Sequence, residues 1–139
     1  MELLVKEPYV RVFVPTADTQ GFLNRFVTAF GGKIDFQFTH EPSESTVYAV
    51  STALGRYSVT STDKEQPEFI AKTRAVYIVK NIDDVLAVAV KNGMEIGQEK
   101  SPVPIGFQAR LKVSEGNYLE LAEWNDAHIA QLRAAGFEF

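Results

Sequence analysis

The residues of this chain that could carry chemistry are few, and their types exclude several kinds of catalysis. The chain has no cysteine, so thiol nucleophiles, disulfides and cysteine-based zinc sites are excluded. Its two histidines, His40 and His128, lie in a predicted loop and a predicted tail helix. His40 beside Glu41 could act as a general base, but no residue that would orient its ring is apparent. The serines between positions 43 and 51 lack the strand–turn–helix elbow of a serine hydrolase.

One predicted strand near the start places three large side chains on a single face. Residues 9–14 are β-branched, aromatic or basic, and alternation along a strand puts Tyr9, Arg11 and Phe13 on the same side. A guanidinium is a rigid fork of donors that fits a carboxylate or a phosphate. Aromatic rings around a few polar groups are typical of a small-molecule pocket, and we expect Tyr57 to face the same way from a later strand.

The elements that would position these residues occur twice. Each copy has an apolar strand, an amphipathic helix ending at glycine, and short strands with a glycine turn. The copies span residues 9–61 and 74–124, with a charged linker at 62–73 and a C-terminal helix and tail at 125–139. Each repeat needs its twin to bury its open face. We therefore predict one α+β domain, residues 1–139, built from two βαβββ modules.

Local signals set the expected boundaries within each module. Asp18 and Asn81 are the expected N-caps of the two module helices, because their side-chain oxygens can accept from backbone N–H groups in the first turn. Residues 100–106 contain two prolines and are predicted to form a loop. A hairpin is expected to turn at residues 114–116, and the indole of Trp124 is expected to pack against the tail helix.

Composition and charge narrow the possible partners. The chain has 139 residues, of which 45% are hydrophobic, and a formal net charge of −4. This acidic balance argues against broad binding to nucleic acid or to anionic membranes. No apolar run approaches the roughly 20 residues that span a bilayer, and the first residues are too short and too acidic for a signal peptide. We expect a cytoplasmic protein with no nucleic-acid or membrane partner.

Several short segments, taken in order, resemble the vicinal oxygen chelate superfamily, which includes glyoxalase I, bleomycin-resistance proteins and extradiol dioxygenases. They are Val12–Pro15, Phe30–Gly31, Pro104–Phe107 and Gly116–Leu121, the last being a Gly-Asn turn leading to Glu-Leu. The resemblance covers about residues 9–124. It implies a curved mixed sheet and a cup-shaped cavity between the modules, in which such proteins hold a metal and a substrate.

The resemblance also implies where metal ligands would lie. The four usual positions fall at Tyr9, about Val59, Arg74 and Glu120, and only Glu120 is of the usual ligand type. Divalent metals in such cavities prefer imidazole nitrogens and carboxylate oxygens. Valine offers no donor atom and arginine is a permanent cation. The resemblance with these departures implies no bound metal and no cofactor.

The same resemblance places Arg74 and Glu120 side by side in the cavity, and two roles stay open for them. They could form a salt bridge that takes the place of the metal, which need not add stability. Alternatively, Arg74 could bind a ligand's carboxylate or phosphate while Glu120 orients the guanidinium. Phe107 follows a Pro-Gly loop and is either a lid over the cavity or an ordinary strand residue.

We therefore expect a protein that binds a small organic, acidic molecule between its modules without a metal, as bleomycin-resistance proteins sequester a drug. The expected ligand-binding residues are Tyr9, Arg11, Tyr57, Val59, Arg74, Phe107 and Glu120. The alternative is an enzyme, a lyase, isomerase or dioxygenase, that uses Glu120 as a base with or without a metal. A further alternative is a structural or regulatory module, and in each case we expect a homodimer, because exposed sheet edges favour pairing.

Overall fold

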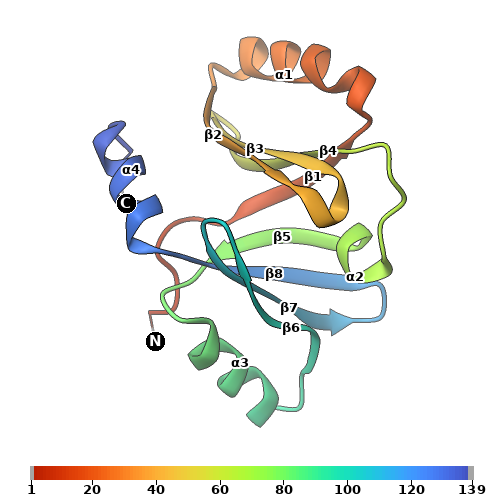
Figure 1. Ribbon diagram of the computed structural model, residues 1–139, viewed down its shortest axis with the longest axis vertical. Coiled ribbons are helices and arrows are strands. Elements are labelled where there is room, and N and C mark those ends of the chain that lie inside the picture. The colour runs from red at the N-terminus through yellow and green to blue at the C-terminus, as the bar shows by residue number, and fades with distance from the viewer. Residues whose placement is uncertain (1, 138–139) are drawn as a thin grey trace. The chain divides into compact units, whose positions relative to one another are not determined.

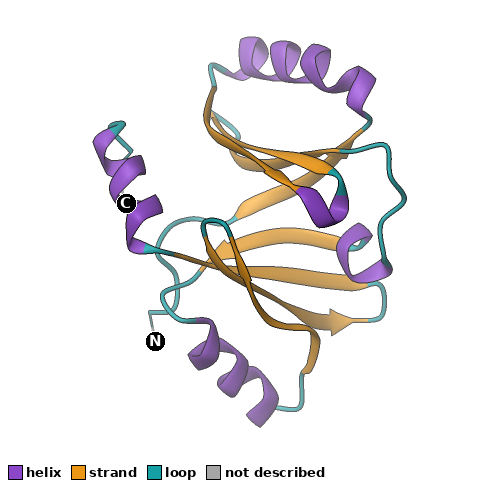
Figure 2. Ribbon diagram, in the orientation of Figure 1, coloured by secondary structure: helices purple, strands orange, loops and turns teal. Residues whose placement is uncertain are grey.

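The computed structural model describes residues 2–137, which form two compact units (Figures 1 and 2). The first unit comprises residues 9–67, and the second combines residues 2–8 with residues 68–137. Each unit contains a strand, a helix and three further strands, so the α+β class and the repeated βαβββ order are confirmed. No helix in the described part of the chain is long and apolar enough to cross a membrane.

The first unit is a four-stranded mixed sheet with one long helix on one face (Figure 1). Its strand order is β2-β3-β4-β1; β1 and β4 run parallel, and the other two pairs are antiparallel. Leu23 of the helix is buried in a cluster with Val14, Val50 and Val59. The elements are β1 (Tyr9–Val14), α1 (Thr16–Phe30), β2 (Lys33–His40), the 3-10 helix η1 (Glu41–Ser43), β3 (Ser45–Thr52) and β4 (Gly55–Ser61).

The second unit repeats this arrangement in the strand order β5-β8-β7-β6. β5 and β8 are parallel, and the β6–β7 and β7–β8 pairs are antiparallel. Ile82, Leu86 and Ala89 of its long helix pack on Leu121 and Ala109 of the sheet. The elements are α2 (Glu68–Ala71), β5 (Thr73–Ile78), α3 (Ile82–Lys91), β6 (Glu95–Val103), β7 (Gly106–Ser114), β8 (Asn117–Trp124) and α4 (Asp126–Ala134).

The two long helices begin differently. Asn81 caps α3 as predicted, accepting a hydrogen bond from the Asp84 N–H at 3.0 Å. The prediction for Asp18 was wrong, because α1 already begins at Thr16, and the N-cap residue is Pro15, which has no side-chain acceptor. The Thr16 N–H instead donates to a carboxylate oxygen of Asp63 at 2.9 Å. One cap is therefore local in sequence, and the other comes from 47 residues away.

The predicted loop at residues 100–106 is largely strand. β6 continues through Lys100 to Val103, and Pro102 pairs with Phe107 of β7. Proline removes one ladder hydrogen bond, but β6 ends the strand order of its unit, and an edge strand tolerates that loss. Only the short turn before Gly106 remains of the expected loop.

The first residues of the chain belong to the second unit. Leu4 forms an antiparallel bridge with Val79, beside β5. The Lys6 side chain is buried, with its ammonium 5.5 Å from the ring centroid of Trp124 and 3.6 Å from that of Phe137. Cations are attracted to the faces of aromatic rings, and this contact ties the start of the chain to the segment that follows α4.

Candidate functional site

In each unit the long helix covers one face of the sheet, and this decides which side chains can meet a ligand. We call the face opposite α1, and likewise the face opposite α3, the distal face of its unit. Because side chains alternate along a strand, the pairing register assigns each residue to one face. The polar and charged residues of interest on the distal faces are Arg11, Arg56, Ser58 and Thr60 in the first unit, and Thr73, Gln98, Arg110 and Glu120 in the second.

A buried charged cluster lies on the distal face of the second unit. Arg110 of β7 and Glu120 of β8 are paired across the hairpin, and Arg110 Nη2 donates to Glu120 Oε1 at 2.6 Å. Their side chains are only 4% and 12% exposed. The same guanidinium donates from Nε to Thr73 Oγ1 at 2.9 Å and from Nη1 to Gln98 Oε1. The central carbon of the Arg110 guanidinium lies 5.7 Å from the ring centroid of Phe69.

In this cluster the carboxylate of Glu120, the one residue of the usual metal-ligand type, is bonded to the permanently charged guanidinium of Arg110. Charge-assisted hydrogen bonds are strong when desolvated, and the loss of one partner leaves the other charge buried. Glu120 is therefore bonded to a guanidinium at the position where the resemblance implies a metal ligand. In the part of the chain that the structure describes, no three histidine, cysteine, aspartate or glutamate side chains gather in a group that could hold a metal ion.

Arg74 does not lie beside Glu120. It is the extra residue of an irregularity in the β5–β8 register, where Thr73 pairs with Tyr118 and Ala75 with Leu119. A bulge of this kind turns one side chain away from its neighbours. Arg74 is exposed and donates to Asn117 Oδ1 at 3.0 Å and to the Gly116 carbonyl at 3.2 Å. The expected pair of Arg74 and Glu120 does not form, and Glu120 is bonded to Arg110 instead.

The strand β1 presents Tyr9 and Arg11 as the alternation predicts. Tyr9 is 2% exposed and pairs with Arg56 in the register, while Arg11 is half-buried and pairs with Ser58. The guanidinium carbon of Arg11 lies 5.7 Å from the centroid of the Phe13 ring. Two arginines therefore share the distal face of the first unit, and sequence reasoning had singled out only Arg11.

The structure places Tyr57 and Val59 on the opposite face, under α1. Val59 is fully buried with Leu23, and the Tyr57 ring meets that of Phe26 edge-on at 4.8 Å. Neither side chain shares a surface with Arg11. The alternation of β4 explains this, because its apolar residues follow the helix side and its polar residues point the other way.

Phe107 lies at the start of β7, away from the charged cluster. It is 39% exposed, and the Lys100 ammonium lies 4.5 Å from its ring centroid. Lys100 also forms an ion pair with Asp83 of α3 at 3.1 Å. Phe107 is on the same side of β7 as Ala109, which packs under α3. It is thus an ordinary strand residue at the rim of the helix-covered face.

The two histidines take part in local structure. His128 is 7% exposed and its ring meets that of Trp124 edge-on at 4.9 Å, which confirms that the indole packs on the tail helix. Burial lowers the pKa of His128. His40 Nδ1 lies 2.6 Å from Ser43 Oγ, which lies 2.6 Å from Ser45 Oγ, so the ring does have an orienting partner. Both serines are buried, and this chain of hydrogen bonds fixes the turn between β2 and β3.

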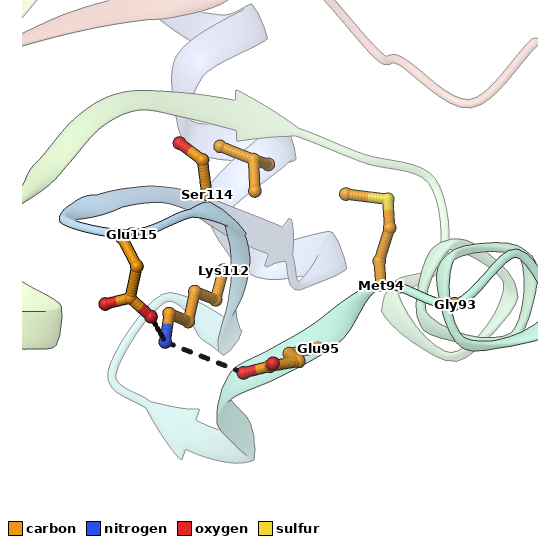
Figure 3. Close-up of a pocket in the computed structure, with 7 residues that line it drawn as sticks. Gly93, Met94, Glu95, Lys112, Ser114 and Glu115 are labelled. Atoms are coloured by element: carbon orange, nitrogen blue, oxygen red, sulfur yellow. Dashed lines mark hydrogen bonds and ion pairs between the residues drawn. The ribbon is translucent and has the colours of Figure 1, made fainter.

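A cavity of about 220 Å³ opens at the end of the second unit's sheet (Figure 3). Lys112 lines this cavity, and its Nζ lies 2.5 Å from Glu115 Oε1 and 3.7 Å from Glu95 Oε2. The hydrogen bond with Glu115 raises the pKa of the Lys112 ammonium. Met94 and the glycine before it form the opposite wall. The ion pairs satisfy the charges of this cavity locally, so we assign it no ligand.

Neither a scan against models of protein families nor a search of curated proteins finds a match for this chain. Solved structures do resemble it. A selenomethionine form of methylmalonyl-CoA epimerase superposes with a TM-score of 0.69, covering 91% of this chain and 99% of that chain at 14% identity. The methylmalonyl-CoA epimerase of Mycobacterium tuberculosis gives a TM-score of 0.67, covering 93% of this chain and 91% of that chain at 12% identity.

An uncharacterized protein from Methanosarcina mazei is similar as well. Its TM-score is 0.62, and the superposition covers 90% of this chain and 95% of that chain at 20% identity. Methylmalonyl-CoA epimerase is a vicinal oxygen chelate protein. This chain has the same fold as these structures. At these identities the likeness establishes the fold alone, which agrees with the two predicted βαβββ modules. The residues that act on a ligand must be argued from this chain itself.

Proposed function

We propose that this protein binds a small organic molecule with an acidic group, and that it does so without a bound metal. The observation that carries the proposal is the 2.6 Å contact between Arg110 and Glu120. In a metal-dependent protein of this fold the carboxylate would face a cation. Here a guanidinium supplies that positive charge permanently, because arginine is always protonated in proteins.

The other positions implied for metal ligands support the same proposal. Val59 is buried under α1 and has no donor atom, and Arg74 is occupied at the β7–β8 turn. The acidic nature of the ligand is supported by the arginines of the first unit's distal face, Arg11 and Arg56, in a chain whose net charge is −4. A local pair of cations in an acidic protein favours an anionic group over a cationic one.

Metal analysis tests the metal-free part of the proposal. Protein purified without chelator is analysed for zinc, manganese, iron, nickel and cobalt, and its thermal midpoint is measured with and without EDTA. We expect less than stoichiometric metal and an unchanged midpoint. One equivalent of metal that disappears in Glu120→Gln would contradict the proposal, because it would show that this carboxylate binds an ion despite Arg110.

A thermal-shift panel tests ligand binding. Each carboxylic acid in the panel is matched with its neutral amide, so that only the charge differs. A ligand at 100 times its dissociation constant adds about 2.7 kcal/mol to the free energy of unfolding. We expect at least one acid to raise the thermal midpoint while its amide does not. A panel in which no acid acts, or in which amides act equally, would contradict the acidic-ligand proposal.

A second candidate function is an isomerase, epimerase or lyase, favoured by the fold likeness to methylmalonyl-CoA epimerases. Glu120 would be its base, and would have to move away from Arg110 to accept a proton. The test is exchange of the acidic hydrogen of methylmalonyl-CoA in D₂O, followed by mass spectrometry. Exchange by the natural chain that is lost in Glu120→Gln would favour this enzyme over the binding protein.

We further propose that the protein acts as a cytoplasmic homodimer. β2 and β6 end the strand orders of their units, and edge strands can pair with a second chain. Multi-angle light scattering on the full chain, at several concentrations, measures the mass in solution. A mass of one chain at all concentrations would contradict the dimer, and it would leave the ligand proposal intact.

A further inference from the structure

The two strands that end the strand orders of their units differ in how their outer edges are protected. β6, in the second unit, contains Pro102 and has two irregularities in its register with β7. Glu95, Glu99 and Lys100 place charges along the same strand. Prolines, bulges and charged side chains are the features by which proteins keep an edge strand from pairing with another chain. β6 is therefore built against such pairing.

β2, in the first unit, has a long segment without these features. Its register irregularity lies between Ile34 and Phe36, next to its two formally charged residues, Lys33 and Asp35. From Phe36 to His40 the register with β3 is uninterrupted, and this segment contains no proline, carboxylate or ammonium group. In the part of the chain that the structure describes, the strand order gives β2 one neighbour, β3. A strand in this position presents alternate backbone N–H and C=O groups toward its outer side.

A twofold axis restricts how β2 can pair with the β2 strand of a second copy. In an antiparallel pair, residues directly opposite each other lie on the same face of the sheet. Because side chains alternate between faces, two identical strands meet this condition only when the axis passes through a residue. An axis through Phe38 pairs every residue from Phe36 to His40, whereas an axis through a neighbouring residue leaves part of this segment unmatched.

The register about Phe38 places matching side chains opposite each other. Phe38 lies opposite Phe38 of the second copy, and Phe36 lies opposite His40. Aromatic side chains directly across two strands stabilise a sheet. Gln37 lies opposite Thr39, and an amide and a hydroxyl are able to form a hydrogen bond. The segment is thus complementary to itself, as the interface of a twofold dimer requires.

The side chains of this segment are accessible on both faces of the sheet. Gln37 pairs with Tyr48 on the face that bears α1, yet Gln37 and Thr39 are exposed, so the helix does not cover them. Phe36 and Phe38 are half-buried on the distal face, and their rings stack with centroids 6.3 Å apart. A second copy extends this row of rings and removes more of their surface from water, which favours association.

From this contrast we infer that β2 is the strand that binds a second copy of this chain, pairing antiparallel with the copy's own β2 about a twofold axis at Phe38. The sheets of the two first units then form one continuous sheet, with both distal faces on the same side. The inference rests on the proposed homodimer, and it specifies the strand and the register that form it. It assigns no contact to β6.

Charges introduced at positions 37 and 39 test the register without altering the core. In the double variant Gln37→Lys with Thr39→Lys, each new ammonium lies opposite another, and like charges directly opposite destabilise a strand pair. The double variant Gln37→Lys with Thr39→Glu places opposite charges across the same contact. Sedimentation equilibrium on the full chain gives the dimer dissociation constants. We expect the natural chain to dimerise, the first variant to dimerise about 10-fold more weakly or less, and the second to recover the dimer.

Glu99→Lys is the matched control for net charge. It raises the net charge as much as the two lysines together, but it does so at an exposed residue of β6. We expect its dimer dissociation constant to stay within about twofold of the natural value, because a single exposed charge has little effect away from a contact. Circular dichroism confirms that every variant is folded.

Disulfide cross-linking provides an independent measurement, because the natural chain has no cysteine. Chains that carry Gln37→Cys are mixed with chains that carry Thr39→Cys and are mildly oxidised. Residues directly opposite have Cβ atoms roughly 4.5–5.5 Å apart, whereas diagonal neighbours are farther apart, at roughly 7–8 Å. A disulfide needs closely spaced Cβ atoms. We therefore expect mass spectrometry to find more disulfide between unlike chains than between like chains.

The outcomes separate this inference from the proposed homodimer. If the natural chain is a dimer and the lysine double variant dimerises equally well, β2 is not the contact and the homodimer survives on another surface. If Glu99→Lys weakens the dimer as much as the two lysines do, the effect is one of net charge and the inference is wrong. An excess of disulfide between like chains, or no recovery in the opposite-charge variant, would refute the register. A natural chain that is monomeric at every concentration contradicts the inference and the homodimer together.

Discussion

The two units use the same strand order and the same kind of core, but they differ on the face that the helix leaves uncovered. Under α1 the first sheet presents Val14, Val50 and Val59, and under α3 the second sheet presents Ala109, Leu111 and Leu121. On the distal face, the second unit holds an arginine bonded to a glutamate, whereas the first holds two arginines on adjacent strands with serine and threonine. The repeat is thus conserved in its packing and divergent in its chemistry.

The difference shows which part of a duplicated fold is constrained. A helix-covered face must fill a fixed volume with apolar atoms, and each lost methyl group costs stability. The distal face must satisfy only hydrogen bonding and charge, which several sets of residues can do. One copy can therefore place a bonded arginine–glutamate pair on this face, while the other places two arginines on adjacent strands there. The following predictions test this contrast.

The largest effect is expected from Arg110→Leu. It leaves the Glu120 carboxylate buried without its guanidinium partner, and we expect the free energy of unfolding in urea to fall by about 3–5 kcal/mol. The double variant Arg110→Leu with Glu120→Leu should recover most of this loss. Arg74→Leu, an exposed arginine, should cost about 1 kcal/mol or less. Equal effects of Arg74 and Arg110 would refute the assignment of the buried pair.

A smaller effect distinguishes the two faces of β4. Val59→Ala opens a space in the core under α1 and should lower the free energy of unfolding by about 2 kcal/mol. Ser58→Ala, one residue earlier on the distal face, should cost clearly less. The measurement is urea unfolding of both variants beside the natural chain. A larger loss for Ser58→Ala would mean that the alternation of β4 is reversed.

The helix caps provide a third test. Asn81→Ala removes the local cap of α3 and should cost about 1 kcal/mol. Asp63→Ala removes the acceptor at the start of α1, and because that contact is exposed its cost should be lower. Thermal unfolding of the two variants gives the comparison. A costlier Asp63→Ala would show that the long-range cap is needed to hold α1.

The smallest effect concerns pH. Burial lowers the pKa of His128 in the folded state, so the unfolded chain binds a proton more readily. Stability is therefore full above the unfolded-state pKa of about 6.5, and falls as the pH decreases from there toward the lower folded-state pKa. The replacement His128→Gln should flatten this part of the stability profile. Unfolding measured between pH 5 and 8 checks the slope, and an unchanged slope in the variant would contradict the prediction.

The order of strands and helices could be predicted from the sequence, because apolar residues recur with the strand or helix period in the main elements of both units. Less of the site could be predicted. Arg110 could have been found, because counting back from the turn before Asn117 places it opposite Glu120. Arg56 could also have been identified, since the polar residues of this alternating strand are Arg56, Ser58 and Thr60.

Other features could not be foreseen. The bulge that separates Thr73 from Ala75 leaves no sequence signal, and it sends Arg74 away from the carboxylate that the family pattern assigns to it. The placement of Tyr57 and Val59 failed for a different reason. Val59 follows from the family pattern and Tyr57 from its residue type, and neither signal contains the alternation of β4, in which a shift of one residue moves every side chain to the opposite face.

The contact between Lys6 and the rings of Trp124 and Phe137 has a consequence for biosynthesis. Residues 9–67 are contiguous, so every residue of the first unit is synthesised before the second unit is complete. The second unit combines residues 2–8 with residues 68–137, so residues 2–8 lack their packing partners until the later segment has been synthesised. During that interval the nascent protein exposes a long unfinished segment, and this is when we expect chaperone assistance to matter most.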